Sequence, residues 1–342
     1  MTGHAAGDPA KDITAEDAAK VLAEASEVAL FAHVAPDADA LGSALAVASA
    51  LRQRGKRVWV AFGEPAETPE SLRHLDPLHL VVPVDAVPAA PELIVALDTA
   101  SAARLGILAG RVSASIAAGG TVLVLDHHVS NTRFGTHNHI DPTAEATATI
   151  AARVLEAMGV ALTDPGGEPI ARGLYAGLAT DTSMFRRATP DTHRLAARLL
   201  EAGVDADATL RPITDVHPFG WLRMLSAVLA GARLEPDAAR GLGLVSAVVT
   251  AEDAAGLRSE EVESVVDVVR ATGEAEVAAV LKQAGPSTWT GSLRAVGALD
   301  VSAVARHFGG GGHTLAAGFT AHGSAREVLD ELRSALESAP LR

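Results

Sequence analysis

The sequence contains no cysteine and very few aromatic residues. Among its 342 residues there is no Cys, and Phe, Trp and Tyr together make up only 3%. The lack of Cys excludes disulfides, thiolate metal sites and cysteine nucleophiles. Because 48% of the residues are hydrophobic, the chain can still bury a sizeable core, and that core must be mainly aliphatic.

Long apolar runs and a surplus of basic residues are also missing. No stretch approaches the ~20 apolar residues of a membrane span, and Met1 to Lys11 contain no apolar signal-peptide core. The 28 Lys and Arg against 42 Asp and Glu give a net charge of −14. A protein that grips long nucleic acid usually shows a basic face. The composition therefore predicts a soluble, cytoplasmic globular protein without a membrane or long nucleic-acid partner.

The first half of the chain alternates between predicted strands and predicted helices. Strands are predicted at 28–33, 57–62, 93–97 and 122–125, and the last two are continuous apolar runs, as expected for strands that are buried on both faces. Helical periodicity covers 14–26, 40–54, 144–158, 169–179 and 192–202, and Asp39 is expected to cap the second of these helices. This alternation predicts a doubly wound α/β domain with a parallel sheet.

The pattern changes after residue 210, which predicts a second and smaller α/β domain. A proline-containing stretch near 212–218 and a helix over 221–230 resemble a connector. Strands are predicted at 243–249, 275–282 and 288–294, and helices at 260–270, 301–307 and 326–337. The expected boundaries are 12–210 for the first domain, 211–235 for the connector and 236–339 for the second domain.

Acidic and histidine residues cluster just after buried elements of the first domain. The clusters are His33 with Asp37 and Asp39, then Asp98, then Asp126-His127-His128, and finally Asp181. Because the carboxyl ends of parallel strands converge on one crevice, we expect three of these clusters to meet there. Crowded carboxylates repel one another unless a cation lies between them, and imidazoles beside them suit a divalent metal.

The spacing of the acidic residues favours two metals rather than one. Asp37 and Asp39 are two positions apart, so their side chains can diverge toward two neighbouring ions, and Asp98 can place one oxygen on each. His127 and Asp181 would complete the set of ligands around the second ion. Two metals roughly 3.5–4 Å apart can activate water for in-line attack at phosphorus. A two-metal hydrolase is therefore the leading interpretation.

These four clusters resemble the four motifs of the DHH phosphoesterase superfamily. The later segment Phe308-Gly309-Gly310-Gly311-Gly312-His313-Thr314-Leu315-Ala316-Ala317-Gly318 resembles the DHHA1 signature. Within the superfamily, the chain is similar to the bifunctional oligoribonucleases and 3′-phosphoadenosine-5′-phosphate (PAP) phosphatases, the nano-RNases. The resemblance implies a DHH domain and a DHHA1 domain with a cleft between them, and a homodimer.

The resemblance also implies a role for each site residue. The first of two Mn²⁺ ions, with Mg²⁺ as the alternative, would be held by His33, Asp37 and Asp98. The second would be held by Asp39, Asp98, His127 and Asp181. His128 would face the scissile phosphate, and Asp126 would orient His127. In the second domain, the substrate would be bound by Arg294, Gly310, Gly311, Gly312 and His313.

The implied activity is hydrolysis of short oligoribonucleotides to mononucleotides and of PAP to AMP. Three alternatives remain open at this point. A cyclic or linear dinucleotide phosphodiesterase would use the same site, and Ser183, Ala295 and Val296 depart from the family pattern in ways that bear on this choice. An inorganic pyrophosphatase shares the metal motifs, although Arg294 and the glycine-histidine segment argue against it. An RNA-binding module without turnover is the third alternative.

Overall fold

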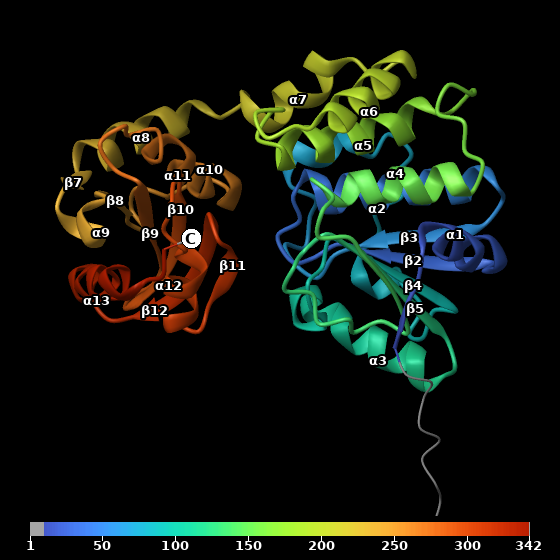
Figure 1. The fold of residues 1–342 in the computed structure, drawn as a ribbon, viewed down its shortest axis with the longest axis horizontal. Coiled ribbons are helices and arrows are strands. Elements are labelled where there is room, and N and C mark those ends of the chain that lie inside the picture. Colours follow the sequence, from blue (N-terminus) through green and yellow to red (C-terminus); the bar gives the residue numbers. More distant parts are fainter. Residues whose placement is uncertain (1–9, 342) are drawn as a thin grey trace, which may run out of the picture. The chain divides into compact units, whose positions relative to one another are not determined.

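The computed structural model of the protein describes residues 10–341 and divides them into two compact units, with the boundary between Val216 and His217 (Figure 1). The segment 1–9 lies outside the described residues. It makes up most of Met1 to Lys11, the stretch in which no signal-peptide core was expected. None of the described helices is long and apolar enough to cross a membrane.

A six-stranded, all-parallel sheet forms the centre of the first unit, as the sequence predicts. The strand order is β1-β6-β5-β4-β2-β3. The strands are β1 (Lys11–Asp12), β2 (Glu27–Phe31), β3 (Arg57–Ala61), β4 (Leu93–Leu97), β5 (Thr121–Asp126) and β6 (His137–Ile140). All five residues of β4 are buried, because helices cover both faces of the sheet. The predicted doubly wound α/β fold is confirmed.

The helices of the first unit are divided between the two faces of the sheet. Figure 1 shows α2 and α4 on one side of the sheet and α3 on the other. The first side belongs to a core that also includes α1 and α5, and the second side has its own smaller core. The helices are α1 (Ala15–Glu24), α2 (Ala38–Gln53), α3 (Ala109–Ala117), α4 (Thr147–Ala157), α5 (Glu168–Asp181), α6 (Pro190–Glu201) and α7 (Ala206–Thr214), with the 3₁₀ helices η1 (Glu70–Leu75), η2 (Val84–Ala86) and η3 (Ala102–Leu108).

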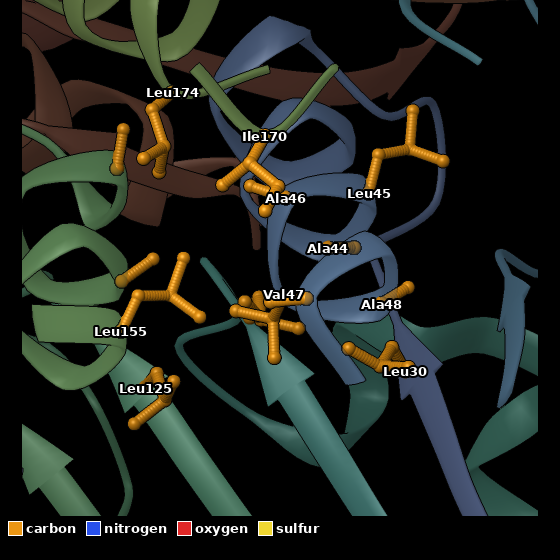
Figure 2. Packing of buried hydrophobic residues seen from close by; sticks show 14 of the residues in the cluster. Leu30, Ala44, Leu45, Ala46, Val47, Ala48, Leu125, Leu155, Ile170 and Leu174 are labelled. Atoms are coloured by element: carbon orange, nitrogen blue, oxygen red, sulfur yellow. The ribbon is translucent and has the colours of Figure 1, made fainter. Parts of the chain in front are cut away.

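Helices α2 and α5 pack unusually closely, and glycine permits this. A Cβ atom on Gly42 would lie 2.4 Å from the carbonyl oxygen of Gly173, and a Cβ on Gly173 would lie equally close to that of Gly42. Around this contact the core is aliphatic. Figure 2 shows Val47 of α2 among buried side chains that include Leu125 of the sheet and Ile170 of α5. The close approach fixes the position of α5, whose last residue is Asp181.

The second unit contains a mixed six-stranded sheet with the order β11-β12-β10-β9-β8-β7, in which only β8 and β9 pair in parallel. One face packs against α12 and α13, and the other against α8 and α11. The strands are β7 (Arg233–Glu235), β8 (Leu244–Val249), β9 (Val277–Gly285), β10 (Thr288–Ala295), β11 (Gly311–His313) and β12 (Ala316–His322), and the helices are α8 (Phe219–Ala230), α9 (Ala238–Gly241), α10 (Ser259–Glu263), α11 (Val265–Val269), α12 (Val301–His307) and α13 (Ala325–Ser338).

Three elements differ from the sequence prediction. The helix α7 was not predicted, and it continues through Pro212 to Thr214, into the stretch expected to form the connector. The helix predicted over 260–270 is divided into α10 and α11 at Ser264. No strand was predicted in the glycine run 309–312, yet part of it forms β11 by pairing with β12.

Candidate metal centre

The carboxyl ends of β2, β4 and β5 bring the predicted site residues together. His33 follows β2 by two positions, Asp98 follows β4 directly, and Asp126 is the last residue of β5. These three strands are neighbours in the sheet, so their ends meet at one edge. Asp37 and Asp39 enter from the start of α2, and Asp181 enters from the end of α5.

A first group of metal-ligand atoms is formed by His33, Asp37 and Asp98. The Nε2 atom of His33 lies 3.7 Å from Oδ2 of Asp37 and 3.6 Å from Oδ2 of Asp98. The other ring nitrogen, Nδ1, lies 2.8 Å from the carbonyl oxygen of Val34. A proton on Nδ1 can be donated to that carbonyl, which leaves Nε2 as a neutral donor for a cation.

A second group is formed by Asp39, His127 and Asp181, whose ligand atoms lie within 4.8 Å of one another. The Nε2 atom of His127 is 3.3 Å from Oδ2 of Asp181 and 3.5 Å from Oδ1 of Asp98. The two oxygens of Asp98 therefore face different groups, Oδ2 toward His33 and Oδ1 toward His127. A carboxylate in this position can bridge two ions.

Asp98 adopts a backbone conformation that is rare for a residue with a side chain. Its φ is +54°, in the left-handed region, and its N–H donates a 3.0 Å hydrogen bond to the carbonyl oxygen of Leu125 in the neighbouring strand. Such conformations cost free energy and persist where the surrounding structure enforces them, commonly at functional sites. The turn aims the carboxylate toward His33 and His127 instead of continuing the strand.

The start of α2 corrects one prediction about Asp39. The N-cap is Asp37, whose Oδ1 accepts hydrogen bonds from the N–H groups of Asp39 and Ala40 over 3.1 and 2.9 Å. Asp39 lies in the first turn and is 1% exposed. Its carboxylate caps another helix, because Oδ2 accepts from the N–H of Thr147 over 2.7 Å and Oδ1 from that of Ala148 over 2.8 Å.

Crowding shifts the pKa values of the acidic residues in opposite directions. Burial and the charges of Asp98 and Asp181 raise the pKa of Asp39 well above its ordinary value. Burial and the charge of Asp98 likewise raise the pKa of Asp181, to about 7. Burial opposes ionisation of Asp98 as well, but hydrogen bonding to His33 and the nearby charges of His128 and His33 lower its pKa overall. The raised pKa values of Asp39 and Asp181 reflect carboxylates that are crowded together, and a bound cation would relieve this repulsion.

The histidines respond to the same negative field. Burial alone would lower the pKa of His33, but hydrogen bonds and charges from Asp37 and Asp98 raise it to about 10. For His128, burial again acts downward, while the hydrogen bond and charge of Asp126 and the charge of Asp98 raise its pKa overall. Oxygen and imidazole nitrogen donors without thiolate, in a field that attracts cations, fit Mn²⁺ or Mg²⁺.

Comparison with known proteins identifies the family. The chain matches the DHH family N-terminal domain over residues 27–178 and the DHHA1 domain over residues 243–339. It is 32% identical over 316 residues, 90% of this chain and 89% of the relative, to a bifunctional oligoribonuclease and PAP phosphatase NrnA of Thermus thermophilus. The chain belongs to the DHH/DHHA1 family. It is therefore a phosphoesterase, a hydrolase of a family that depends on metal.

Solved structures show the same fold. An exopolyphosphatase-related protein from Bacteroides fragilis superposes with a TM-score of 0.84 at 23% identity, with 95% of each chain covered. The protein RecJ of Thermus thermophilus superposes with a TM-score of 0.54 at 18% identity, covering 98% of this chain and 56% of RecJ. Both confirm the predicted two-domain α/β architecture.

Asp126 of the DHH domain has a different partner from the one predicted. The Oδ1 atom of Asp126 accepts a 2.6 Å hydrogen bond from Nδ1 of His128, whereas the ring Nδ1 of His127 lies 3.2 Å from the carbonyl oxygen of Ala144. The main-chain N–H of His127 also donates to Oδ1 of Asp126, over 2.8 Å. Asp126 therefore orients the ring of the second histidine of the motif rather than that of the first.

Three residues near the site were not predicted. Thr147 donates from Oγ1 to Oδ1 of Asp98 over 2.9 Å, and Asn131 donates from Nδ2 to Oδ2 of Asp126 over 2.6 Å. Arg104 places its guanidinium beside the ring of His33. Asn131 follows Asp126 by only five positions, so its contact with Asp126 could have been expected from the sequence. Nothing in the sequence around Thr147 indicates contact with a residue 49 positions away.

In the DHHA1 domain, the sheet brings the predicted substrate residues near one another. Arg294 of β10 pairs with Ala316 of β12, and His313 of β11 pairs with the same Ala316. The Arg294 side chain lies 3.8 Å from Oδ1 of Asp267, and burial lowers the pKa of Arg294.

The glycine run 309–312 has a conformation that side chains would disturb. Gly312 has a φ of +141°, and a Cβ on Gly310 would lie 2.2 Å from the carbonyl oxygen of Gly318. Glycine is thus required for the conformation of this segment.

Proposed function

We propose that this protein is a Mn²⁺-dependent phosphoesterase that hydrolyses short oligoribonucleotides to mononucleotides and PAP to AMP. The observation that carries the proposal is the position of Asp98, whose two oxygens face two separate groups of metal ligands. The choice of substrate is supported by the relative from Thermus thermophilus, which is named an oligoribonuclease and PAP phosphatase and matches nearly the full chain.

The proposed ligands of the first ion are His33, Asp37 and Asp98. Those of the second are Asp39, Asp98, His127 and Asp181. Their donor atoms suit Mn²⁺ or Mg²⁺, and the related RecJ has been solved in complex with Mn²⁺. When bound, such a pair of ions supplies Lewis-acid stabilisation of the phosphoryl oxygens and activation of a water molecule.

The protein's own residues add orientation and charge. His128, held by the 2.6 Å hydrogen bond to Asp126, is proposed to donate from its other ring nitrogen to an oxygen of the scissile phosphate. Arg294, Gly310, Gly311, Gly312 and His313 of the DHHA1 domain are proposed to bind a part of the substrate that does not react. A guanidinium and exposed main-chain N–H groups both suit an anionic ligand.

The proposal includes a homodimer in the cytoplasm. The helix α8 exposes three large apolar side chains in the single chain, with Phe219 71%, Leu222 54% and Leu229 39% exposed. Exposed apolar side chains on one helix are typical of an interface. Light scattering is expected to give the mass of a dimer for the wild type and of a monomer for Leu222→Glu. A wild-type monomer at micromolar concentration would contradict the proposal.

The substrate class can be tested by a turnover panel with Mn²⁺ that contains PAP, linear pApA, cyclic di-AMP and inorganic pyrophosphate. We expect AMP from PAP and from pApA, and slow or no turnover of pyrophosphate. Asp98→Ala should abolish every activity, whereas Asp191→Ala, at an exposed aspartate that pairs with Arg194, should leave them unchanged. Cyclic di-AMP as the best substrate would replace the proposal by a cyclic dinucleotide phosphodiesterase.

A further inference from the structure

Arg104 is held beside the metal centre by its main chain. It lies in η3, which follows β4, and its carbonyl oxygen accepts a 2.8 Å hydrogen bond from the N–H of Val34, the residue after His33. The next residue, Leu105, is fully buried in the core under the sheet. The position of Arg104 is therefore fixed by contacts that do not involve its side chain.

The guanidinium of Arg104 lies beside an imidazole ring. Its Nη2 lies 3.3 Å from Nδ1 of His33, and within residues 10–341 no Asp or Glu lies at ion-pairing distance from it. When Nε2 of His33 serves as a metal ligand, Nδ1 carries a proton that is donated to the carbonyl oxygen of Val34, 2.8 Å away. The arginine then faces another donor, so its N–H groups remain available to an anion from outside.

The negative charge of the metal site favours a cationic side chain such as Arg104 nearby. Five carboxylates gather at this edge of the sheet, from Asp37, Asp39, Asp98, Asp126 and Asp181, and they exceed the four positive charges of two divalent ions. A substrate with two phosphates would bring further negative charge. Arg104 is exposed and lies at the Nδ1 side of the His33 ring, whereas Nε2 of that ring faces the carboxylates of Asp37 and Asp98.

We propose that Arg104 binds a second phosphate of the substrate, the one next to the phosphate that is cleaved. A guanidinium presents paired N–H donors that match the oxygens of a phosphate. Arg104 would thereby favour substrates and ligands with two phosphates over those with one. The inference deepens the proposed function and rests on its phosphoesterase site, but not on the identity of the best substrate.

The test compares ligands that differ by one phosphate. Hydrolysis of bis(p-nitrophenyl) phosphate, which carries a single phosphate, reports on the metal site alone. In wild type, PAP, which carries two phosphates, should inhibit this reaction more strongly than AMP when both are measured from initial rates, before PAP itself is hydrolysed. In Arg104→Gln, inhibition by the bisphosphate should weaken by about 10- to 100-fold, the loss expected for a charged hydrogen bond, while inhibition by AMP changes little. Arg104→Lys should fall between the two.

Two controls separate substrate binding from an indirect effect on His33. Calorimetric titration with Mn²⁺ should give the same affinity for wild type and Arg104→Gln. Arg111→Gln removes a guanidinium from the following helix α3 that donates to the carbonyl oxygen of Val84 over 3.4 Å, and it should leave both inhibition constants unchanged. An equal loss of affinity for AMP and the bisphosphate, or weaker Mn²⁺ binding in Arg104→Gln, would overturn the proposal. Failure of PAP or pApA as substrates would contradict the proposed function without affecting this comparison.

Discussion

The main-chain N–H of Thr147 donates a 2.7 Å hydrogen bond to Oδ2 of Asp39, a residue 108 positions earlier in the chain. The neighbouring N–H of Ala148 donates to Oδ1 of the same carboxylate over 2.8 Å. The N-cap residue of α4, Ala146, has no side chain that could satisfy these groups. A proposed metal ligand therefore also caps a helix, where a negative charge is favourable.

We expect Asp39→Ala to lower the free energy of unfolding of the metal-free protein by about 1–2 kcal/mol more than Asp39→Asn does. The asparagine keeps one oxygen acceptor for α4 and relieves repulsion from Asp98 and Asp181, which raises the pKa of Asp39 in the wild type. Urea unfolding in the presence of EDTA measures the difference. Equal stability of the two variants would show that the cap contributes little.

The glycine contact between α2 and α5 predicts a large effect from one methyl group. In Gly173→Ala the new Cβ would lie 2.4 Å from the carbonyl oxygen of Gly42, so the helices must separate, at a cost of about 1–3 kcal/mol. The matched control is Gly110→Ala in α3, where a Cβ meets nothing within 4 Å and helix propensity should raise stability slightly. Thermal unfolding of both variants tests this. A Gly173→Ala protein as stable as Gly110→Ala would refute the close packing.

Metal should stabilise the folded protein, because the ligand set exists only in the native state. Saturating Mn²⁺ is expected to raise the Tm of the wild type, and EDTA should reverse the rise and abolish activity. Asp98→Asn removes the carboxylate that faces both groups, so its Tm should respond much less to Mn²⁺. The same Mn²⁺-induced shift in wild type and Asp98→Asn would argue against a shared ligand.

Glu145 predicts a pH dependence of stability outside the metal ligands. Burial acts to raise its pKa, but hydrogen bonds from the hydroxyl groups of Thr189 and Thr192, at 2.5 and 2.7 Å, lower it overall. A carboxyl group with a lowered pKa in the folded state stabilises the fold above its unfolded value of 4.5, and this stabilisation is lost as the pH falls below it.

Glu145→Gln should accordingly be less stable than wild type at pH 7, and the difference should shrink as the pH approaches 3.5. Urea unfolding at several pH values measures both chains under the same conditions. If the difference stays constant with pH, the effect of Glu145 on the free energy of unfolding comes from its packing and not from its charge.

Much of the DHH domain could be predicted because its strands are buried on both faces. The runs at 93–97 and 122–125 are continuous and apolar, and they became β4 and β5. The polar strand β6 could not be predicted, since His137, Asn138 and His139 lack that pattern. Because Asp98 and Asp126 stand at the carboxyl ends of two neighbouring parallel strands, they were expected to lie close together.

The remaining features depend on tertiary contacts that no local pattern encodes. Asp39 was predicted to cap its own helix, but the first turn of α2 placed Asp37 there and left Asp39 for α4. No strand was predicted in the glycine run, and pairing with β12 made part of it a strand. Arg104 follows Asp98 by six positions, and only the fold shows that it lies beside His33.

The measurement that tests the central claim most directly is the catalytic efficiency, kcat/KM, on a ladder of RNA from 2 to about 25 nucleotides with Mn²⁺. With a net charge of −14, the protein offers little extended electrostatic grip for a long strand. We predict that RNAs of about two to five nucleotides are cleaved at least tenfold more efficiently than the 25-mer, and that Asp98→Ala cleaves none of them. Equal efficiency on the 5-mer and the 25-mer would contradict a phosphoesterase of short oligoribonucleotides.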